Sequence, residues 1–422
     1  MNKLNKVQSV ELSGKTVLMR VDHNVVKNGE IIDPYRIDAT LPTINHIIDE
    51  GAKLVLMTHI GRPRDKATGK IDISDKTSVK VIVEYLQKKG IKVLEADLPE
   101  YDEFGISHLD PAAINTRLNQ ENVEAVYLPN TRWFKGEEAK DDTRNILGKE
   151  MADLADIFVN DAFGSWQPHA STIVPAQFIP AYAGILMQKE IIHLDAVLKP
   201  HRPFVAVVAG SKFDTKMEPL SALLNLADFL ILGGVIYNAY LCAKYDVKIA
   251  GISEDDRKIA LEFVKLASKF PNKVIEPQFI VESDTLEGKF NGQYRILDIR
   301  KLSKGQELNY VLDIDSSSFE SETMQQLFAD AGTFFVNAVM GLTPHFTKGT
   351  IALDSLISDN YRSIKLFGGG DTLQEFANLL PELYREALED RKYYFFTGGG
   401  TILKAISEDS VWGLEPVKAL KK

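Results

Sequence analysis

One strand-to-helix junction organises the chain, and it reads Lys365-Leu366-Phe367-Gly368-Gly369-Gly370-Asp371-Thr372. The apolar run 364–367 predicts a buried strand, and the residues that follow Thr372 have the pattern of a helix. Glycines at such a turn let backbone N–H groups approach a phosphate, and the helix N-terminus adds about half a positive charge. Asp371 then stands where a carboxylate binds a metal ion, and Thr372 where a hydroxyl caps a helix. Alone, the pattern fits a plain tight turn equally well.

A second copy of this pattern strengthens the phosphate interpretation. The apolar run 393–396 meets Thr397-Gly398-Gly399-Gly400, roughly 30 residues after the first turn. Two such turns at this spacing are typical of adjacent strands in one parallel sheet. The sequence therefore predicts a site for a polyphosphate.

Length and composition define the class of protein. A chain of 422 residues is too long for one ordinary core, so two domains are expected. The net charge of −10 argues against general binding to nucleic acid or to membrane surfaces. Cys242 is the only cysteine, so no intrachain disulfide can form, and no apolar run reaches membrane-spanning length. We expect a cytoplasmic protein.

The first half alternates predicted strands and helices, and polar side chains follow the strands. Ligands bind at the C-terminal edge of an open parallel sheet, which is where these residues are expected to gather. The residues at this edge are Asp22, Asn24, Arg36, His59, Arg62, Arg132, Asn160, Asp161 and His169. Any one of them could be a solvated loop residue. Three arginines together favour an anion site, because guanidinium groups bind phosphate and carboxylate through paired N–H donors.

A helix is predicted from Pro180 to Leu198, between the two strand-helix series. The second series begins with a buried strand, and Lys212 and Lys216 follow that strand four residues apart. Lysine is unfavourable at a helix N-terminus unless an anion is bound there, although an exposed helix start is the simpler explanation. The chain contains neither a Walker A motif nor a G-x-G-x-x-G motif, which argues against P-loop kinases, protein kinases and nicotinamide enzymes.

The chain resembles the phosphoglycerate kinase family from about residue 10 to its last helix. The order and spacing of the matching stretches make the resemblance specific. These stretches are Arg20-Val21-Asp22-His23-Asn24, Thr58-His59-Ile60-Gly61-Arg62-Pro63, Thr131-Arg132-Trp133-Phe134, Asn160-Asp161-Ala162-Phe163-Gly164, His169-Ala170-Ser171-Thr172, Ala209-Gly210-Ser211-Lys212-Phe213-Asp214-Thr215-Lys216 and the two glycine turns.

The resemblance implies an α/β fold with two doubly wound parallel-sheet domains joined by a hinge helix. It implies an acceptor-binding domain (1–182), an interdomain helix (183–200), a nucleotide-binding domain (201–407) and a C-terminal segment (408–422) that returns to the first domain. The implied activity is reversible phosphoryl transfer between 1,3-bisphosphoglycerate and ADP in glycolysis, with Mg²⁺. A monomer that closes around its small-molecule substrates is also implied.

Residue roles follow from the same resemblance. The implied acceptor ligands are Asp22, Asn24, Arg36, His59, Arg62, Arg132 and His169. The implied nucleotide ligands are Gly210, Lys212, Lys216, Gly234, Asn337, Gly368, Gly369, Gly370, Asp371 and Thr372, with Asp371 on the magnesium ion. The implied catalytic set is Arg36, Lys212, Lys216, Gly370 and Gly399.

The sequence departs from the family at four places, one of which is Val336-Asn337-Ala338-Val339 where the family has Trp-Asn-Gly-Pro. His23 stands where phenylalanine is usual, and the loop around Gln167 is one residue short and lacks an arginine. We therefore expect His23, His59 and His169 to supply part of the acceptor's positive charge, so that binding weakens from about pH 6 to 8. Pro344 replaces the glutamate that meets the ribose, which predicts weak discrimination between ATP and 2′-deoxy-ATP.

Two alternatives remain open from the sequence. One is a non-catalytic paralogue that keeps the fold and binds ligands without turnover. The other is a kinase for a related small phosphorylated carboxylic acid. Lys212, Lys216, Asp371 and both glycine turns favour an active phosphotransferase, because these groups serve transfer more than binding.

Overall fold

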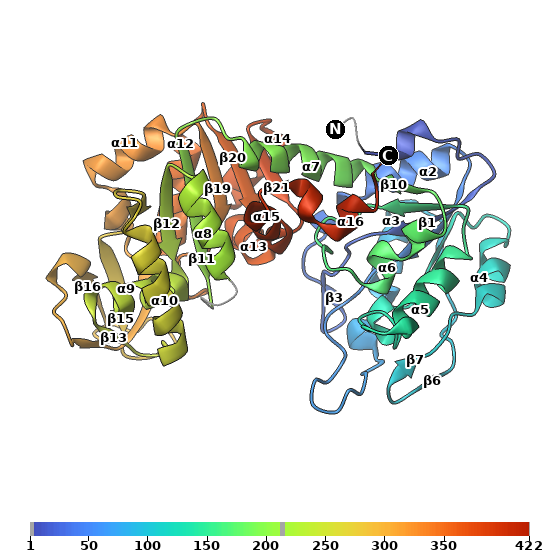
Figure 1. Cartoon of the computed structure of the whole chain (residues 1–422), viewed down its shortest axis with the longest axis horizontal. Helices are drawn as coiled ribbons and strands as arrows, with labels where there is room; N and C mark the ends of the chain where they lie inside the picture. The colour runs from blue at the N-terminus through green and yellow to red at the C-terminus, as the bar shows by residue number, and fades with distance from the viewer. Residues whose placement is uncertain (1–3, 212–215, 422) are drawn as a thin grey trace. The chain divides into compact units, whose positions relative to one another are not determined.

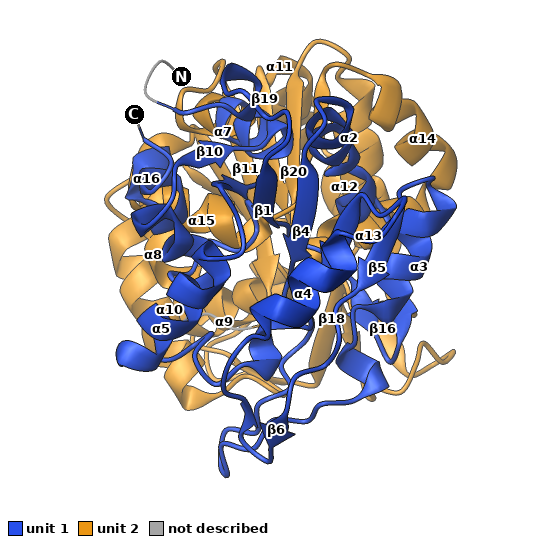
Figure 2. Ribbon diagram, turned by 90° about the vertical axis from the view of Figure 1, so that its right-hand side faces the viewer, with its two compact units in different colours: residues 1–192, 411–422 blue, residues 193–410 orange. Residues whose placement is uncertain are grey.

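The structure is a computed structural model that describes residues 4–211 and 216–421. The chain forms two compact units, one of residues 1–192 with 411–422 and the other of residues 193–410 (Figure 2). Each unit is built on a six-stranded parallel sheet, which confirms the predicted α/β fold with two parallel-sheet domains. No helix in the described ranges is long and apolar enough to cross a bilayer.

The sheet of unit 1 has the strand order β10-β9-β1-β4-β8-β5. Figure 1 labels its strands β1 and β10. Its strands are β1 (Thr16–Arg20), β4 (Lys53–Met57), β5 (Val93–Glu95), β8 (Ala125–Tyr127), β9 (Ile157–Asn160) and β10 (Ala181–Ala183). From β1, the chain first builds the sheet toward β4, β8 and β5 and later returns to add β9 and β10 on the other side. The switch point therefore lies between β1 and β9, which pair in parallel. In a doubly wound sheet, the crevice at such a switch point is where ligands bind.

Helices of unit 1 complete this fold. They are α1 (Tyr35–Asp38), α2 (Leu41–Asp49), α3 (Lys80–Lys88), α4 (Pro111–Leu118), α5 (Asp142–Ala152), α6 (Ala170–Ile173) and α16 (Glu415–Lys418). Two hairpins are added, β2 (Val26–Lys27) with β3 (Glu30–Ile31) and β6 (Tyr101–Asp102) with β7 (Gly105–Ile106). The helix α3 has an apolar stripe at helical spacing, and its residues Ile82, Val83 and Leu86 are buried in the core. The C-terminal segment from Val411 on belongs to unit 1.

The predicted long helix begins five residues later than expected. Residues Ala181–Ala183 form β10, which pairs with β9 at the edge of the sheet, and α7 (Ile185–Leu198) follows. The helical spacing of apolar residues extends back to Pro180, but residues at a sheet edge also bury apolar side chains. Tertiary pairing therefore decides the first residues of this segment. The helix α7 contains the point in the sequence where unit 1 gives way to unit 2.

The sheet of unit 2 has the order β14-β12-β11-β19-β20-β21. Its strands are β11 (Phe204–Gly210), β12 (Phe229–Gly233), β14 (Val274–Ile275), β19 (Thr333–Asn337), β20 (Ile364–Gly368) and β21 (Tyr393–Phe396). The strands β20 and β21 are parallel neighbours, as the two glycine turns predicted. Chain order reverses between β11 and β19, so the switch point of unit 2 lies there.

A smaller antiparallel sheet stands beside one end of this layer, with the order β16-β15-β18. Its strands are β15 (Phe279–Ser283), β16 (Tyr294–Asp298) and β18 (Tyr310–Ile314), and β13 (Lys248–Ile249) pairs separately with β17 (Glu307–Leu308). The helices of unit 2 are α8 (Met217–Leu226), α9 (Gly234–Tyr245), α10 (Glu254–Ala267), α11 (Glu322–Asp330), α12 (Lys348–Asp359), α13 (Gly370–Leu379), α14 (Pro381–Glu389) and α15 (Gly399–Ser407). Ser253 caps α10, because its side chain accepts a hydrogen bond from Asp256 N–H.

Candidate functional site

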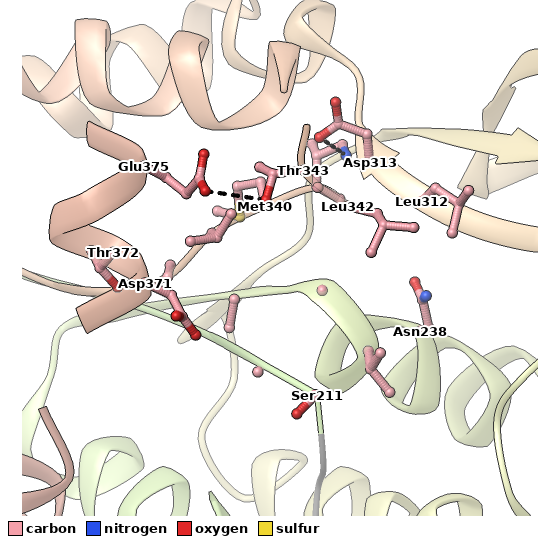
Figure 3. A pocket seen from close by; sticks show the side chains of 18 of the residues that line it. Ser211, Asn238, Leu312, Asp313, Met340, Leu342, Thr343, Asp371, Thr372 and Glu375 are labelled. Carbon is pink, nitrogen blue, oxygen red and sulfur yellow. Dashed lines mark hydrogen bonds between the residues drawn. The ribbon is translucent and has the colours of Figure 1, made fainter. Parts of the chain in front are cut away.

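A cavity of about 590 Å³ opens at the switch point of unit 2. Its walls come from the ends of β11 and β19, the first turns of α9 and α13, and strand β18 (Figure 3). The sequence-predicted residues that line it are Gly210, Lys216, Gly234, Asn337, Gly369, Gly370, Asp371 and Thr372. The structure thus brings together eight members of the implied nucleotide set. Lys212, a ninth member, lies outside the described residues.

The glycine turn after β20 has a conformation that only glycine adopts easily. Gly369 has φ +122°, and a Cβ added there would lie 2.6 Å from Asn337 Nδ2. Gly370 is the first residue of α13, and a Cβ on it would meet nothing within 4 Å. The cavity therefore receives the open N-terminus of a helix, which is a ready site for a phosphate.

Lys216 is fixed by the end of β19. Its Nζ donates to Asn337 Oδ1 at 2.7 Å, and Asn337 Nδ2 donates to the carbonyl oxygen of Gly368. Burial lowers the pKa of Lys216 from 10.5 to about 8. Because the charged form is poorly solvated there, a bound anion would stabilise it. Asn337 thus positions the lysine against the glycine turn as well as lining the cavity.

The roles predicted for Asp371 and Thr372 have different outcomes in the structure. Asp371 is an exposed carboxylate in the first turn of α13, and it lines the cavity. Thr372 is buried inside that turn, so the capping hypothesis is wrong: the N-cap is Gly369, and no side chain caps this helix. A positive φ at the N-cap required glycine and left no side chain for the task.

The residues fit a magnesium ion that arrives with a nucleotide. Among the described residues, no cluster of three or more histidine, cysteine, aspartate or glutamate side chains could hold a metal by itself. Magnesium commonly binds through one or two carboxylates plus substrate phosphates. The carboxylate of Asp371, beside a helix N-terminus suited to phosphate, matches that donor set.

Two predicted glycines lie behind the cavity wall. Gly399 begins α15, and a Cβ there would lie 2.7 Å from Gly369 Cα and 2.8 Å from Asn337 Nδ2. Gly368 is buried at the end of β20. Neither residue lines the cavity. Both allow the two glycine turns to pack closely.

Several lining residues were missed by the sequence reasoning. They are polar side chains that lie outside the motifs quoted above: Asn238 of α9, Asp313 of β18, Thr343, and Glu375 of α13. Burial raises the pKa of Asp313 to about 6, while the N–H groups of Ile314 and Gly349 bind its carboxylate. The signal for Glu375 was its position four residues after Asp371, on the same helix face.

The first polar cluster of unit 1 lies at its own switch point, after β1. Arg20 is completely buried, and its Nε donates to Ser171 Oγ at 2.8 Å. Asp22 is nearly buried and pairs with Arg36 of α1 through Oδ2, while its Oδ1 and Arg36 Nε have no partner. A Cβ on Gly164 would lie 2.9 Å from Arg36 Nη2, so the loop after β9 approaches this pair closely. Unsatisfied buried polar atoms at a switch point indicate a ligand site.

Arg20 was missed as a candidate. It ends β1 and precedes Asp22 by two residues, so its place in the sequence carried the signal. Its Nη2 lies 3.0 Å from His59 Nδ1, and because arginine can only donate, the histidine accepts. This bond joins the ends of β1 and β4.

The remaining acceptor candidates lie beside this pair. Asn24 Oδ1 accepts from Gly61 N–H at 2.8 Å, and Arg132 Nη1 donates to the carbonyl oxygen of the same glycine at 2.5 Å. Arg132 also pairs with Glu138 at 2.9 Å. His169 precedes α6, where its Nε2 lies 3.9 Å from Glu138 Oε1.

Arg62 differs from these residues because its side chain is exposed. It follows β4, at the same edge of the sheet as His59. An exposed guanidinium there is free to meet a charged ligand at low desolvation cost.

The histidines do not supply the positive charge that the sequence suggested. Burial, with Arg20 and Arg132 nearby, holds the pKa of His59 well below 6.5. Burial also lowers the pKa of His169. His23 lies in the core, 3.0 Å from Tyr127 Oη and 2.9 Å from Thr40 Oγ1, and burial lowers its pKa to about 3. The expectation that His23 faces the acceptor is therefore wrong.

Asn160 and Asp161 have structural roles. Asn160 is buried and binds the backbone of Ala162 and Thr172. Asp161 accepts from Thr43 Oγ1 at 2.5 Å and from Met187 N–H at 2.8 Å, at the start of α7. Burial raises the pKa of Asp161 to about 7.

The chain is similar to known proteins over nearly its whole length. A sequence model of the family described as phosphoglycerate kinase matches residues 7–409. The phosphoglycerate kinase of Dictyoglomus turgidum (strain DSM 6724 / Z-1310) is 33% identical over 413 residues, which cover 96% of each chain. That of Wolbachia sp. subsp. Brugia malayi (strain TRS) is 30% identical and covers 100% of each chain.

Solved structures agree. The phosphoglycerate kinase from Coxiella burnetii matches with a TM-score of 0.75 at 28% identity, covering 99% of this chain and 98% of the other. The enzyme from Pyrococcus horikoshii OT3 gives 0.77 at 22% identity with the same coverage, which supports the fold alone. From the family match, the relatives and the fold together, the chain belongs to the phosphoglycerate kinase family, whose members are phosphotransferases of glycolysis.

Proposed function

We propose that the chain catalyses the reversible, magnesium-dependent transfer of a phosphoryl group between 1,3-bisphosphoglycerate and ADP, giving 3-phosphoglycerate and ATP. The observation that carries the proposal is the cavity at the switch point of unit 2. It joins Lys216 to the helix N-terminus at Gly370, with Asp371 beside them.

In this proposal the cavity of unit 2 binds the nucleotide. The open N–H groups of the glycine turn and the helix N-terminus hold phosphate oxygens. Lys216, fixed by Asn337, neutralises charge that develops on the transferred group. Asp371 holds the magnesium ion, which would screen the phosphate charges when bound.

The polar cluster of unit 1 binds the acceptor. Phosphoglycerate carries a phosphate and a carboxylate, and both suit guanidinium groups. Arg36, Arg62 and Arg132 are the proposed anion ligands, with Arg20 buried behind them. The unpartnered Oδ1 of Asp22 is available to accept from the acceptor's hydroxyl group.

This set of residues matches the chemistry of phosphoryl transfer. Such a transfer depends on positioning and on charge stabilisation, and it needs no nucleophile from the protein. The attacking group is an oxygen of one substrate, and the leaving group is an oxygen of the other. The side chains described above bind, orient and neutralise charge.

A coupled assay of the purified chain with 3-phosphoglycerate, Mg²⁺ and ATP tests the proposal. We expect magnesium-dependent turnover, and we expect Lys216→Ala to lower kcat about 10²- to 10³-fold, as loss of one transition-state stabiliser typically does. Lys258→Ala is the matched control, because that lysine is exposed on α10 and pairs only with its neighbour Asp255.

Three outcomes separate the alternatives. Turnover with 3-phosphoglycerate supports the proposal. Binding of both ligands without turnover would identify a non-catalytic paralogue. Turnover that requires another small phosphorylated acid would show that the chain is a kinase but that 3-phosphoglycerate is not its acceptor. This outcome needs testing because the loop around Gln167 is one residue short and lacks the family's arginine.

A further inference from the structure

We propose that Glu375, held by Thr343, recognises the sugar hydroxyl groups of the nucleotide in place of the glutamate that Pro344 replaces. This inference rests on the proposed function, because it assigns a residue to the nucleotide cavity of unit 2. It reverses the expectation, drawn from Pro344 alone, that the chain discriminates weakly between ribose and deoxyribose.

The two side chains meet on the cavity wall. Thr343 Oγ1 donates to Glu375 Oε1 at 3.2 Å, and Figure 3 shows the carboxylate of Glu375 directed from α13 toward this hydroxyl. Both residues line the cavity, whereas Pro344 is not among the described residues that do so. The bond fixes one carboxylate oxygen and leaves the other free to accept.

The position of Glu375 matches the place of a sugar. Asp371 lies in the first turn of α13, at the end of the cavity suited to phosphate. Glu375 is four residues further on the same helix face, about 6 Å along the axis. In a nucleotide the sugar is bonded directly to the phosphate chain. If the phosphates lie at the glycine turn, the sugar therefore lies in the neighbouring part of the cavity. One helix face therefore supplies a carboxylate for the metal and a second for the sugar.

The charge of Glu375 also favours this role. In the described part of the chain, its one hydrogen bond is the bond from Thr343, and it makes no ion pair there. An uncompensated carboxylate would repel a nearby phosphate, so a phosphate is a poor partner for it. A carboxylate accepts hydrogen bonds only, and a sugar with neighbouring hydroxyl groups offers donors to it. The chemistry therefore indicates a ribonucleotide.

Direct binding tests this without relying on turnover. Calorimetry at pH 7 with Mg²⁺ and no acceptor would give Kd for ADP, 2′-deoxy-ADP and 3′-deoxy-ADP. We expect the wild type to bind ADP about 10- to 100-fold more tightly than at least one deoxy analogue, the size of a hydrogen bond to a charged group. Glu375→Ala should weaken ADP binding by a similar factor and leave the affected analogue nearly unchanged.

Two further variants sharpen the test. Thr343→Val releases the carboxylate and should reduce discrimination only partly, while Glu375→Gln keeps an oxygen acceptor and should be intermediate. Gln374→Ala is the matched control, because Gln374 is the exposed neighbour on α13 that does not line the cavity. It should bind all three nucleotides as the wild type does.

The outcomes are distinguishable. Equal weakening of all three nucleotides by Glu375→Ala would show a structural role only and overturn the inference, as would a wild type without discrimination. A defect seen only with Mg²⁺ would place Glu375 on the metal instead and also overturn it. Failure of ADP to bind at all would reject the proposed function itself. Discrimination lost in Glu375→Ala, with or without turnover, supports the inference.

Discussion

Lys216 donates a hydrogen bond of 2.7 Å to Asn337, across the switch point between β11 and β19. Asn337 in turn donates to the carbonyl oxygen of Gly368. The lysine, which precedes α8, is thus tied to the turn that begins α13. A positive charge held at a fixed distance from a helix N-terminus is preorganised for an anion, and needs little rearrangement when the ligand arrives.

Nucleotide affinity should therefore depend on the charge of Lys216. Its pKa is about 8 because burial disfavours the charged form, so the side chain loses its proton as pH rises from 7 to 9. A phosphate's second ionisation is complete near pH 6 to 7, so the nucleotide's charge is constant over this range. We expect Kd for ADP, measured by calorimetry, to rise above pH 8 with a slope that approaches about tenfold per pH unit. Lys216→Arg should give a flat profile, since arginine stays charged. Parallel profiles for the two proteins would mean that another group titrates.

The glycine turn offers a matched pair of substitutions. Gly369→Ala places a Cβ at φ +122° and 2.6 Å from Asn337 Nδ2. We expect it to lower the free energy of unfolding by about 1–3 kcal/mol, the usual cost of strain of this kind. Gly370→Ala meets nothing within 4 Å, so its stability should stay within about 1 kcal/mol of the wild type.

Both variants should bind ADP poorly, because Asn337 is displaced in one and a methyl group faces the phosphate site in the other. Urea unfolding and calorimetry on the same samples separate the two effects. Wild-type stability in Gly369→Ala, or wild-type affinity in Gly370→Ala, would contradict this account of the turn.

His23 should make the protein sensitive to acid. Thr40 Oγ1 donates to the carbonyl oxygen of Ile37, so it accepts from His23, and the imidazole is neutral with Tyr127 donating to Nδ1. Its pKa of about 3 in the folded protein lies below the unfolded value of 6.5. Stability from this group is complete above pH 6.5 and is lost as pH falls toward 3, at up to about 1.4 kcal/mol per pH unit.

His23→Phe removes this titration and should flatten the fall in unfolding free energy between pH 6.5 and 4. At pH 7 it should cost only about 1 kcal/mol, for the lost hydrogen bonds. His108→Gln is the control, because that side chain is 68% exposed. Denaturant unfolding at several pH values measures all three. An acid slope in His23→Phe equal to that of the wild type would assign the acid sensitivity elsewhere.

Local patterns predicted the glycine turn after β20 and the pairing of β20 with β21 well. The turn at Gly369 and Gly370 requires glycine for steric reasons, so the requirement is visible in the residues themselves. The pairing of β20 with β21 followed from the repeat of one motif at a spacing suited to parallel neighbours. The family resemblance added residue roles that spacing alone could not assign.

Side-chain environments were harder to predict, because distant residues create them. His23 resembles a loop residue in the sequence, and only Tyr127 of β8 and Thr40 place it in the core. Arg20 stands two residues before Asp22, which the sequence shows, but its partner Ser171 lies 151 residues away. Glu375 stands four residues after Asp371, which the sequence also shows, but its bond from Thr343 is visible only in the structure. Each of these depends on tertiary packing that no local period encodes.

The burial of His59 and His169 changes the pH dependence that we expect for acceptor binding. The pKa of His59 is well below 6.5, and the pKa of His169 is also lowered. Both imidazole side chains are therefore neutral near pH 7. The positive charge comes from arginines, which stay protonated. Affinity for 3-phosphoglycerate should therefore not weaken from pH 6 to 8. It should rise slightly from about pH 6 to 7, as the ligand's own second ionisation, with a pKa near 6, approaches completion.

Two substitutions in the shortened loop test this assignment. Gln167 Oε1 accepts from His169 Nε2 at 2.9 Å, so the two side chains form a neutral pair beside Glu138. Gln167→Arg restores a positive charge and should tighten binding at every pH, by up to the roughly 10- to 100-fold of one hydrogen bond to a charged group. His169→Gln should shift Kd by the same factor at pH 6 and pH 8, because it removes no charge. The contrary result is a wild type that loses affinity from pH 6 to 8, together with a His169→Gln variant that does not. The bound acceptor would then raise the pKa of His169 enough to protonate it. Histidine would in that case contribute charge to acceptor binding.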